Sequence, residues 1–199
     1  AGFDISVLFS IPEDYYTRFG YMTVLPEYAT TFDGLDRMKR LLALAPAPGS
    51  RVIRRSDVPL LQAFYEHTYR DTPGIIQRDK AHWDWIRLHP DFDGVVITNE
   101  NELSGYALTA LKENHLVVYE AAIDPSPRVQ DALLRSLARK ALATDMTSIR
   151  LDLPPDMPLS RLSVLAYEGM QTVSVPYKKG GMAKIINVAT TMKKMVPVL

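Results

Sequence analysis

The chain of 199 residues contains no cysteine, and its charges cancel. Without cysteine it can have no disulfide, no thiolate metal ligand and no cysteine nucleophile. The 23 Lys and Arg residues balance 23 Asp and Glu residues, so the composition gives no reason to expect a nucleic acid or a membrane as a partner. No apolar run reaches the about 18 residues of a membrane-spanning helix, and no signal peptide is recognisable. We therefore expect a cytoplasmic protein.

Sequence motifs of several enzyme classes are also missing. There is no Gly-x-Ser-x-Gly elbow, no P-loop and no dinucleotide-binding glycine motif. The four histidines, His67, His82, His89 and His115, are scattered along the chain. Because a metal site needs three or four converging ligands, we expect no metal site.

The first 33 residues predict a strand, a short helix and a second strand. Residues 5–9 are apolar and rich in β-branched side chains, as in a buried strand. Pro12 suits the first turn of a helix, and Gly20 can end that helix in a left-handed conformation. Because this segment alone buries too little surface to stay folded, we expect it to pack on an edge of the domain that follows.

The short helix carries three aromatic residues, Tyr15, Tyr16 and Phe19. The tendency of aromatic side chains to be buried favours a place in the core, for two of them above all. The alternative is that one tyrosine keeps its hydroxyl free in a cleft.

A boundary lies between residues 34 and 49. Residues 36–44 have the apolar spacing of a short helix, and residues 45–50 (Ala-Pro-Ala-Pro-Gly-Ser) are typical of a stiff extended linker. The pattern of alternating strands and helices begins again after this linker. We therefore expect a new domain from residue 50 onward.

Residues 50–180 predict a complete domain that alternates strands and helices. The expected strands are 51–54, 95–98, 104–111, 116–123, 149–153 and 170–175. The expected helices are 56–72, 79–88, 130–143 and 158–168.

One run in the first segment resembles a known family. Residues 8–21, Leu-Phe-Ser-Ile-Pro-Glu-Asp-Tyr-Tyr-Thr-Arg-Phe-Gly-Tyr, are similar to the last part of a GNAT N-acyltransferase domain. In that family a tyrosine before an x-x-Phe-Gly element lies beside the sulfur of acetyl-CoA and is the general acid for the departing thiolate. By position that residue is Tyr16. A phenol with a pKa of about 10 can donate a proton to a thiolate without being ionised at neutral pH.

The order of elements after the linker is also that of the GNAT acyl-CoA N-acyltransferase fold. The fold class that we expect is therefore α/β (α+β), with a mixed, mostly antiparallel sheet flanked by helices. In such a fold the strands at 116–123 and 149–153 run parallel and diverge, and we expect side chains or water to fill the gap between them.

The whole chain resembles Eis-like (enhanced intracellular survival) acetyltransferases, which join two GNAT-type domains to a domain similar to sterol carrier proteins. The resemblance implies that residues 1–33 are the C-terminal part of a first GNAT domain and that residues 34–49 are a linker. Residues 50–180 are then a second GNAT-like domain, and residues 181–199 begin the third. It further implies transfer of an acetyl group from acetyl-CoA to the primary amine of a small molecule, by a homo-oligomer.

The second domain departs from a working GNAT domain at the position that holds the cofactor. The family places glycines between the fourth strand and the next helix, so that bare N–H groups hold the CoA pyrophosphate. Here residues 121–128 read Ala-Ala-Ile-Asp-Pro-Ser-Pro-Arg, with two prolines, an acidic Asp124 and no glycine. Two interpretations remain open. Either the chain is part of an acetyl-CoA-dependent enzyme, or it is a non-catalytic module that shapes a substrate cavity or supports oligomerisation.

Overall fold

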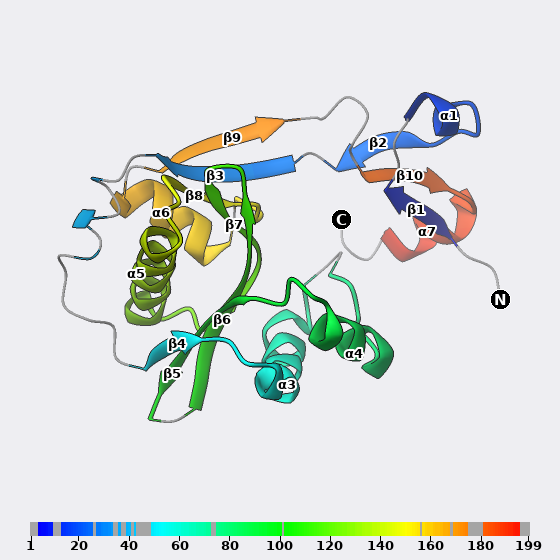
Figure 1. Cartoon of the computed structure of the whole chain (residues 1–199). Helices are drawn as coiled ribbons and strands as arrows, with labels where there is room; N and C mark the ends of the chain where they lie inside the picture. The colour runs from blue at the N-terminus through cyan, green and yellow to red at the C-terminus, as the bar shows by residue number, and fades with distance from the viewer. Residues whose placement is uncertain are drawn as a thin grey trace. The chain divides into compact units, whose positions relative to one another are not determined.

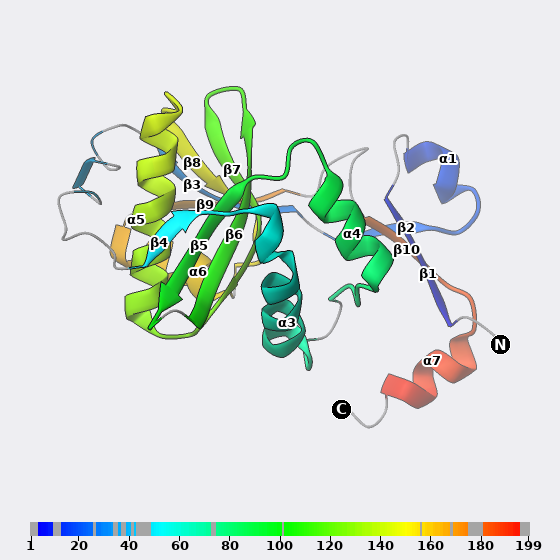
Figure 2. The same ribbon diagram turned by 60° about the horizontal axis from the view of Figure 1, so that its bottom comes forward.

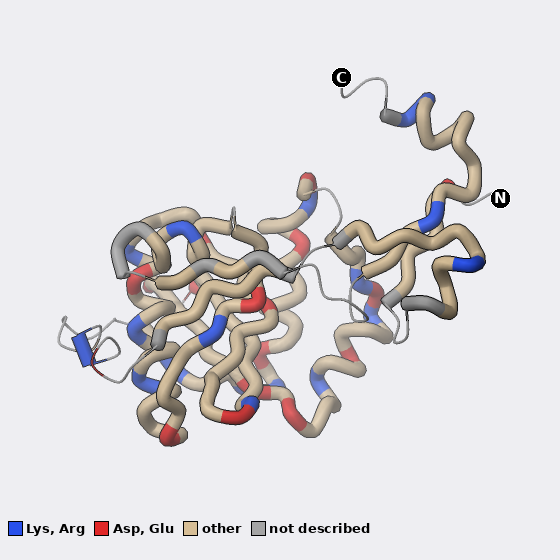
Figure 3. Tube along the Cα trace, turned by 90° about the horizontal axis from the view of Figure 1, so that it is seen from above, with Lys and Arg blue, Asp and Glu red and all other residues tan. Residues whose placement is uncertain are grey.

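The computed structural model describes residues 4–9, 13–25, 27–33, 36, 39–40, 42, 49–72, 75–100, 102–155, 157–167, 169–174 and 181–195 (Figure 1). The chain divides into two compact units. The large unit comprises residues 29–172, and the small unit combines residues 1–28 with residues 173–199. Basic and acidic residues are interspersed along both units (Figure 3), in keeping with the net charge of zero.

The large unit is built on a seven-stranded sheet in the order β4–β5–β6–β7–β8–β3–β9. The strands are β3 (Glu27–Asp33), β4 (Ser50–Val52), β5 (Gly94–Asn99), β6 (Glu102–Lys112), β7 (His115–Ile123), β8 (Ser148–Leu151) and β9 (Met170–Ser174). The pairs β4–β5, β5–β6, β6–β7 and β3–β8 are antiparallel, whereas β7 and β8 are parallel. The mixed, mostly antiparallel sheet is thus confirmed.

Helices cover both faces of this sheet (Figure 2). One face packs against α5 (Pro127–Ala143) and α6 (Pro158–Tyr167), and the other against α3 (Val58–Tyr69) and α4 (Lys80–Leu88). Adjacent residues of a strand point to opposite faces. Val95 and Ala107 therefore belong to the α5 side of the core, and their neighbours Val96 and Tyr106 to the α3 side.

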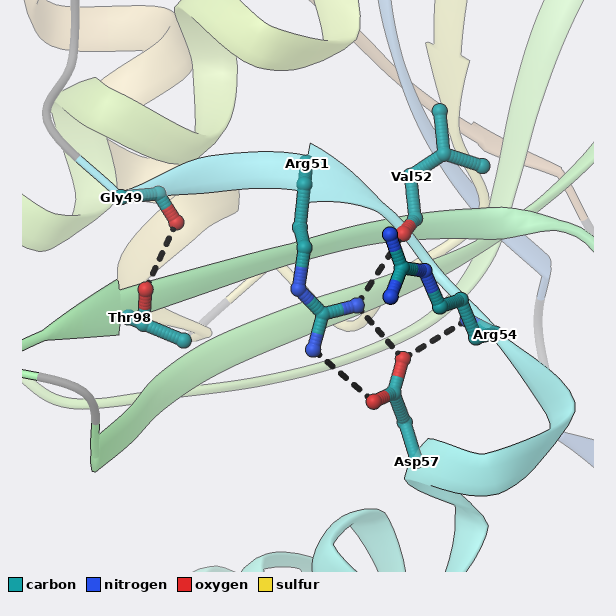
Figure 4. A network of polar contacts seen from close by, with 6 residues as sticks. All are labelled: Gly49, Arg51, Val52, Arg54, Asp57 and Thr98. Atoms are coloured by element: carbon teal, nitrogen blue, oxygen red, sulfur yellow. Dashed lines mark hydrogen bonds and ion pairs between the residues drawn. The ribbon is translucent and has the colours of Figure 1, made fainter.

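The edge strand β4 is held in place by an ion pair (Figure 4). Arg51 donates to both carboxylate oxygens of Asp57 in the 3₁₀ turn η1 (Arg55–Asp57), at 2.7 and 2.8 Å. The main-chain N–H of Arg54 also donates to Asp57 Oδ2, at 2.7 Å. The hydrogen bond from Arg51 lowers the pKa of the Asp57 carboxyl, although burial acts in the opposite direction.

The small unit contains a three-stranded antiparallel sheet in the order β1–β10–β2. Its strands are β1 (Ile5–Phe9), β2 (Met22–Leu25) and β10 (Gly181–Ile185), and its helices are α1 (Glu13–Thr17) and α7 (Val188–Met195). The last strand of the described chain thus lies between the first two. Lys194 of α7 forms an ion pair with Asp4, next to β1.

One face of the small sheet is apolar and exposed. Ile5 pairs with Ile185, and Val7 with Ala183, so these side chains lie on the same face. On β2, Met22 pairs with Ala183 and belongs to that face as well. Ile5, Val7, Met22 and Ile185 have exposed fractions of 48%, 56%, 71% and 53%. An apolar sheet face of this kind is a surface for packing against something else.

Most of the strands and helices predicted between residues 50 and 174 are confirmed to within a few residues. The prediction that residues 1–33 form one strand–helix–strand segment on the following domain is wrong. Residues 27–33 form β3, which joins the large sheet beside β8, whereas β1 and β2 pair with β10. These partners lie more than 100 residues away in the sequence, beyond the reach of a local pattern. The predicted helix at 36–44 and the Pro/Ala linker lie largely outside the described residues.

Candidate functional site

Tyr16, the residue expected to act as general acid, lies on α1 in the small unit. Gly20 follows this helix with a φ of +83°, the left-handed conformation predicted for the end of the helix. The rings of Tyr15 and Tyr21 lie 5.0 and 6.0 Å from that of Tyr16, centroid to centroid, in edge-on contact. Tyr16 is therefore held on two sides by other aromatic rings.

The hydroxyl groups around Tyr16 differ in their hydrogen bonding. The hydroxyl of Tyr21 is 2.7 Å from that of Ser6, whereas no side chain within the described ranges is found to hydrogen-bond the hydroxyl of Tyr16. The expectation that the aromatic residues of this helix belong to the core is wrong for Tyr15 and Phe19, which are 47% and 49% exposed. Tyr16 is half-buried, and none of the described residues occupies its hydroxyl.

The junction between β7 and α5 does not offer a phosphate the free N–H groups that the CoA site of a GNAT domain requires. Asp124 Oδ1 accepts a hydrogen bond from the N–H of Ser126 at 2.8 Å. Pro125 and Pro127 have no N–H, and the N–H of Val129 donates to the carbonyl of Ser126 at 3.0 Å. A carboxylate of the chain itself therefore occupies the start of α5, and the residues present do not fit a CoA pyrophosphate.

The parallel pairing of β7 with β8 is confirmed, and it ends at Val118 and Leu151. From Tyr119 to Ile123 β7 continues without pairing to β8. Within this stretch the Tyr69 hydroxyl of α3 donates to the main-chain carbonyl of Ala121. A side chain of α3 thus contacts β7 beyond its pairing with β8, and the prediction that side chains or water fill the gap between the two strands stays a prediction. Burial, followed by the carboxylate of Glu120, raises the pKa of Tyr69.

A buried polar network on the α3–α4 side was not foreseen from the sequence. Glu120 on β7 forms an ion pair with Arg78, and both side chains are only 12% exposed. Glu120 also accepts from the hydroxyl of Tyr106 at 2.7 Å. The Arg78 guanidinium lies over the rings of Tyr65 and Trp83, at 4.3 and 4.9 Å from their centroids. Arg78 and Glu120 are 42 residues apart, so no sequence motif joins them.

A cavity of about 400 Å³ adjoins this network, between α4 and the strands β6 and β7. Arg78 and Glu120 contribute to its wall, together with Trp85, Phe92 and Tyr119. Its volume lies in the lower part of the range of about 300–1,000 Å³ for small-molecule sites. Within the part of the chain that the structure describes, no group of three or more His, Asp or Glu side chains is arranged to hold a metal ion.

Comparison with known proteins gives a fold but no close relative. No protein-family model matches the sequence, and no curated protein is similar to it. Among solved structures, the chain is similar to a GCN5-related N-acetyltransferase from Kribbella flavida, with a TM-score of 0.66 and 16% identity over 94% of this chain and 44% of the other. A GCN5-related N-acetyltransferase from Anabaena variabilis gives a TM-score of 0.66 and 16% identity, over 93% of this chain and 46% of the other. A conserved protein from Enterococcus faecalis V583, described as a probable N-acyltransferase, gives a TM-score of 0.67 and 15% identity, over 96% of this chain and 47% of the other.

These likenesses establish the fold class. The chain has the α+β fold of GCN5-related N-acetyltransferases, with its mixed sheet flanked by helices. It spans less than half the length of the three structures that it matches. None of the helices in the described ranges is long and apolar enough to cross a membrane.

Proposed function

We propose that this chain is part of an acetyl-CoA-dependent N-acetyltransferase of the Eis-like type, which acetylates primary amines of small molecules. The likeness in fold to GCN5-related N-acetyltransferases is the observation that carries the proposal. In this proposal Tyr16 donates a proton to the thiolate of CoA as the amide forms. The position of Tyr16 between the rings of Tyr15 and Tyr21, with no hydrogen-bond partner for its hydroxyl among the described residues, supports this role.

The large unit takes a different part in this proposal. Asp124 and two prolines stand at the start of α5, so we assign the large unit no CoA of its own. It then serves as a non-catalytic module that shapes the substrate cavity or supports a homo-oligomer. Residues 50–180 are accordingly a degenerate second GNAT domain, and acetyl-CoA binds to the first.

The exposed apolar face of the small sheet supports the domain assignment. In our proposal β1, α1 and β2 belong to a first GNAT domain together with β10, whereas β3 belongs to the sheet of the second. Ile5, Val7 and Met22 then pack against the remainder of that first domain rather than facing solvent. The cytoplasm is the compartment that we propose, since acetyl-CoA would be the acyl donor.

Titration of the 199-residue chain with CoA tests the part assigned to the large unit. We expect no heat of binding up to millimolar CoA, because the carboxylate of Asp124 already occupies the start of α5. A dissociation constant in the micromolar range would instead mean that this chain holds a cofactor site.

Kinetics of the longer protein test the role of Tyr16. Tyr16→Phe should lower the rate of acetyl transfer from acetyl-CoA to an amine by about 10²-fold, the usual scale for loss of a general acid. Tyr15→Phe is the matched control, since neighbouring side chains on a helix point about 100° apart. Equal and small effects of the two substitutions would remove Tyr16 from the mechanism.

A further inference from the structure

The cavity between α4 and the β6–β7 hairpin has a feature that the proposed acetyl transfer does not use. Trp85, one of two tryptophans in the chain, contributes to the wall of the cavity. Its side chain is nevertheless 61% exposed. Its ring is in edge-on contact with His82 and His89, at centroid distances of 6.0 and 5.0 Å. A large aromatic side chain is thus fixed at the mouth of a cavity while most of its surface faces solvent. Such a ring is suited to stack on a ligand.

A second aromatic side chain is turned toward the cavity by an irregularity in β7. Leu108 of β6 pairs with Glu120, and Thr109 pairs with Val118, so Tyr119 is an extra residue with no partner on β6. This is a β-bulge, a device that redirects a side chain out of the regular alternation. Tyr119 contributes to the cavity wall, as does Phe92. Three aromatic residues from two separate parts of the chain therefore surround one cavity.

Four charged side chains contribute to the cavity wall, namely Arg78, Lys112, Asp91 and Glu120, and Arg78 pairs with Glu120. The Arg78 guanidinium, which could hold an anion, is already bound by both carboxylate oxygens of Glu120 and is covered by two aromatic rings. The Asp91 carboxylate contributes to the wall and has no ion-pair partner among residues 75–100 or the other described ranges. Burial raises the pKa of the Tyr119 hydroxyl, and the carboxylates of Glu120, Asp93 and Asp91 raise it further against the effect of Arg78. The carboxylates near Tyr119 therefore favour the protonated phenol, and the faces of the aromatic side chains in the wall themselves attract cations.

We propose that the cavity between α4 and β6–β7 binds a small aromatic amine in its cationic form. The ring of the ligand packs on the aromatic wall of Trp85, Tyr119 and Phe92, and its ammonium group is held by Asp91. The site lies entirely within the large unit and needs neither CoA nor Tyr16. The proposal of this site is therefore independent of the proposed acetyl transfer.

Isothermal titration of the 199-residue chain with tryptamine, tryptophan and indole-3-acetate tests the charge that the cavity prefers. These probes share an indole ring and are a cation, a zwitterion and an anion at pH 7. Tryptamine should bind at least about 10-fold more tightly than indole-3-acetate, because one well-placed charge is worth about that factor. Tighter binding of indole-3-acetate or of tryptophan would overturn the proposal, the latter because Lys112 also contributes to the wall. No binding of tryptamine at about 10 mM would overturn it as well.

Two substitutions locate the site. Trp85→Ala should weaken tryptamine binding about 10-fold or more, since stacking on this ring is lost. Leu88→Ala is the matched control on the same helix, because Leu88 is 65% exposed and does not belong to the cavity wall. Equal losses in the two variants would place the ligand elsewhere.

If Trp85→Ala does not fold, the Asp91→Asn variant tests the same site. This substitution should reduce the affinity for tryptamine to that for neutral indole and leave the binding of indole unchanged.

Discussion

Asp57 accepts three hydrogen bonds, two from the Arg51 side chain and one from the Arg54 main chain. Its side chain is only 9% exposed, whereas that of Arg51 is 39% exposed, so water screens the ion pair from the arginine side alone. The interaction with Arg51 favours the ionised carboxylate and lowers its pKa in the folded state. A lowered pKa in the folded state ties the stability of the protein to pH.

The contribution of Asp57 to stability should be lost in acid. Its folded pKa is below the value of about 3.9 for an unfolded chain, so the contribution is fully present above that value and fades as the pH falls through the folded pKa. We predict that Asp57→Asn lowers the free energy of unfolding by about 1–3 kcal/mol at pH 7, and by less at pH 3. Urea denaturation of both proteins at the two pH values measures the difference. Asp84→Asn, at an ion pair that water reaches, should have little effect at either pH.

The residues of the two candidate sites differ in how far sequence could reveal them. Tyr16 could be singled out because its neighbours along the chain, through Phe19 and Gly20, make up a local motif. Glu120 and Arg78 could not, because they lie 42 residues apart and meet only when the chain has folded. The bulge at Tyr119 was equally hidden, since the sequence of β7 reads as a regular apolar strand.

At the scale of strands and helices, prediction succeeded where the pattern is local. The segments from α3 to β8 alternate between helical and extended periodicity, and their bounds follow from capping residues and prolines. β10 was expected to open a separate domain, yet it lies between β1 and β2. The partners of a strand depend on contacts between distant residues, and no periodicity within the strand encodes them.

The contact between β5 and β6 depends on a glycine. A Cβ atom added to Gly94 would lie 2.1 Å from the carbonyl oxygen of Ala107, a main-chain atom that cannot move aside alone. We predict that Gly94→Ala destabilises the protein by about 2–3 kcal/mol, because β5 or β6 must shift.

Gly105→Ala is the comparison for this prediction. There the nearest atom is the side-chain Cγ1 of Ile123, at 3.1 Å, which can yield by a small rotation. The free energy of unfolding of the Gly105→Ala variant should therefore remain within about 1 kcal/mol of that of the unsubstituted protein. Urea denaturation measures both variants, and equal losses would mean that the close approach at Gly94 is relieved without cost.

At the scale of the whole molecule, the two units differ in what protects their sheets. The central strands of the large sheet are covered by helices on both faces, and Leu116, Val118 and Tyr106 are fully buried. The small sheet has three strands and one exposed apolar face. A sheet with fewer buried contacts opens more readily.

The rate of amide hydrogen exchange should differ between the two units. We predict that the amides of β1, β2 and β10 exchange on the order of 100-fold faster than those of β6 and β7, because local opening of the small sheet exposes less new surface. Mass spectrometry of peptic fragments, or NMR, measures this in the intact chain. Equal protection of the two sheets would mean that the units unfold together.

The place of β10 between β1 and β2 has a consequence for synthesis of the chain. A ribosome makes β1 and β2 before the large unit, but β10, the strand that joins them, follows only after the whole of the large unit. At about 5–20 residues per second, this interval is on the order of 10 s. During that time the apolar side chains of β1 and β2 and the edges of both strands lack their partner, while the large unit can already fold. The growing chain should therefore need chaperones most for β1 and β2.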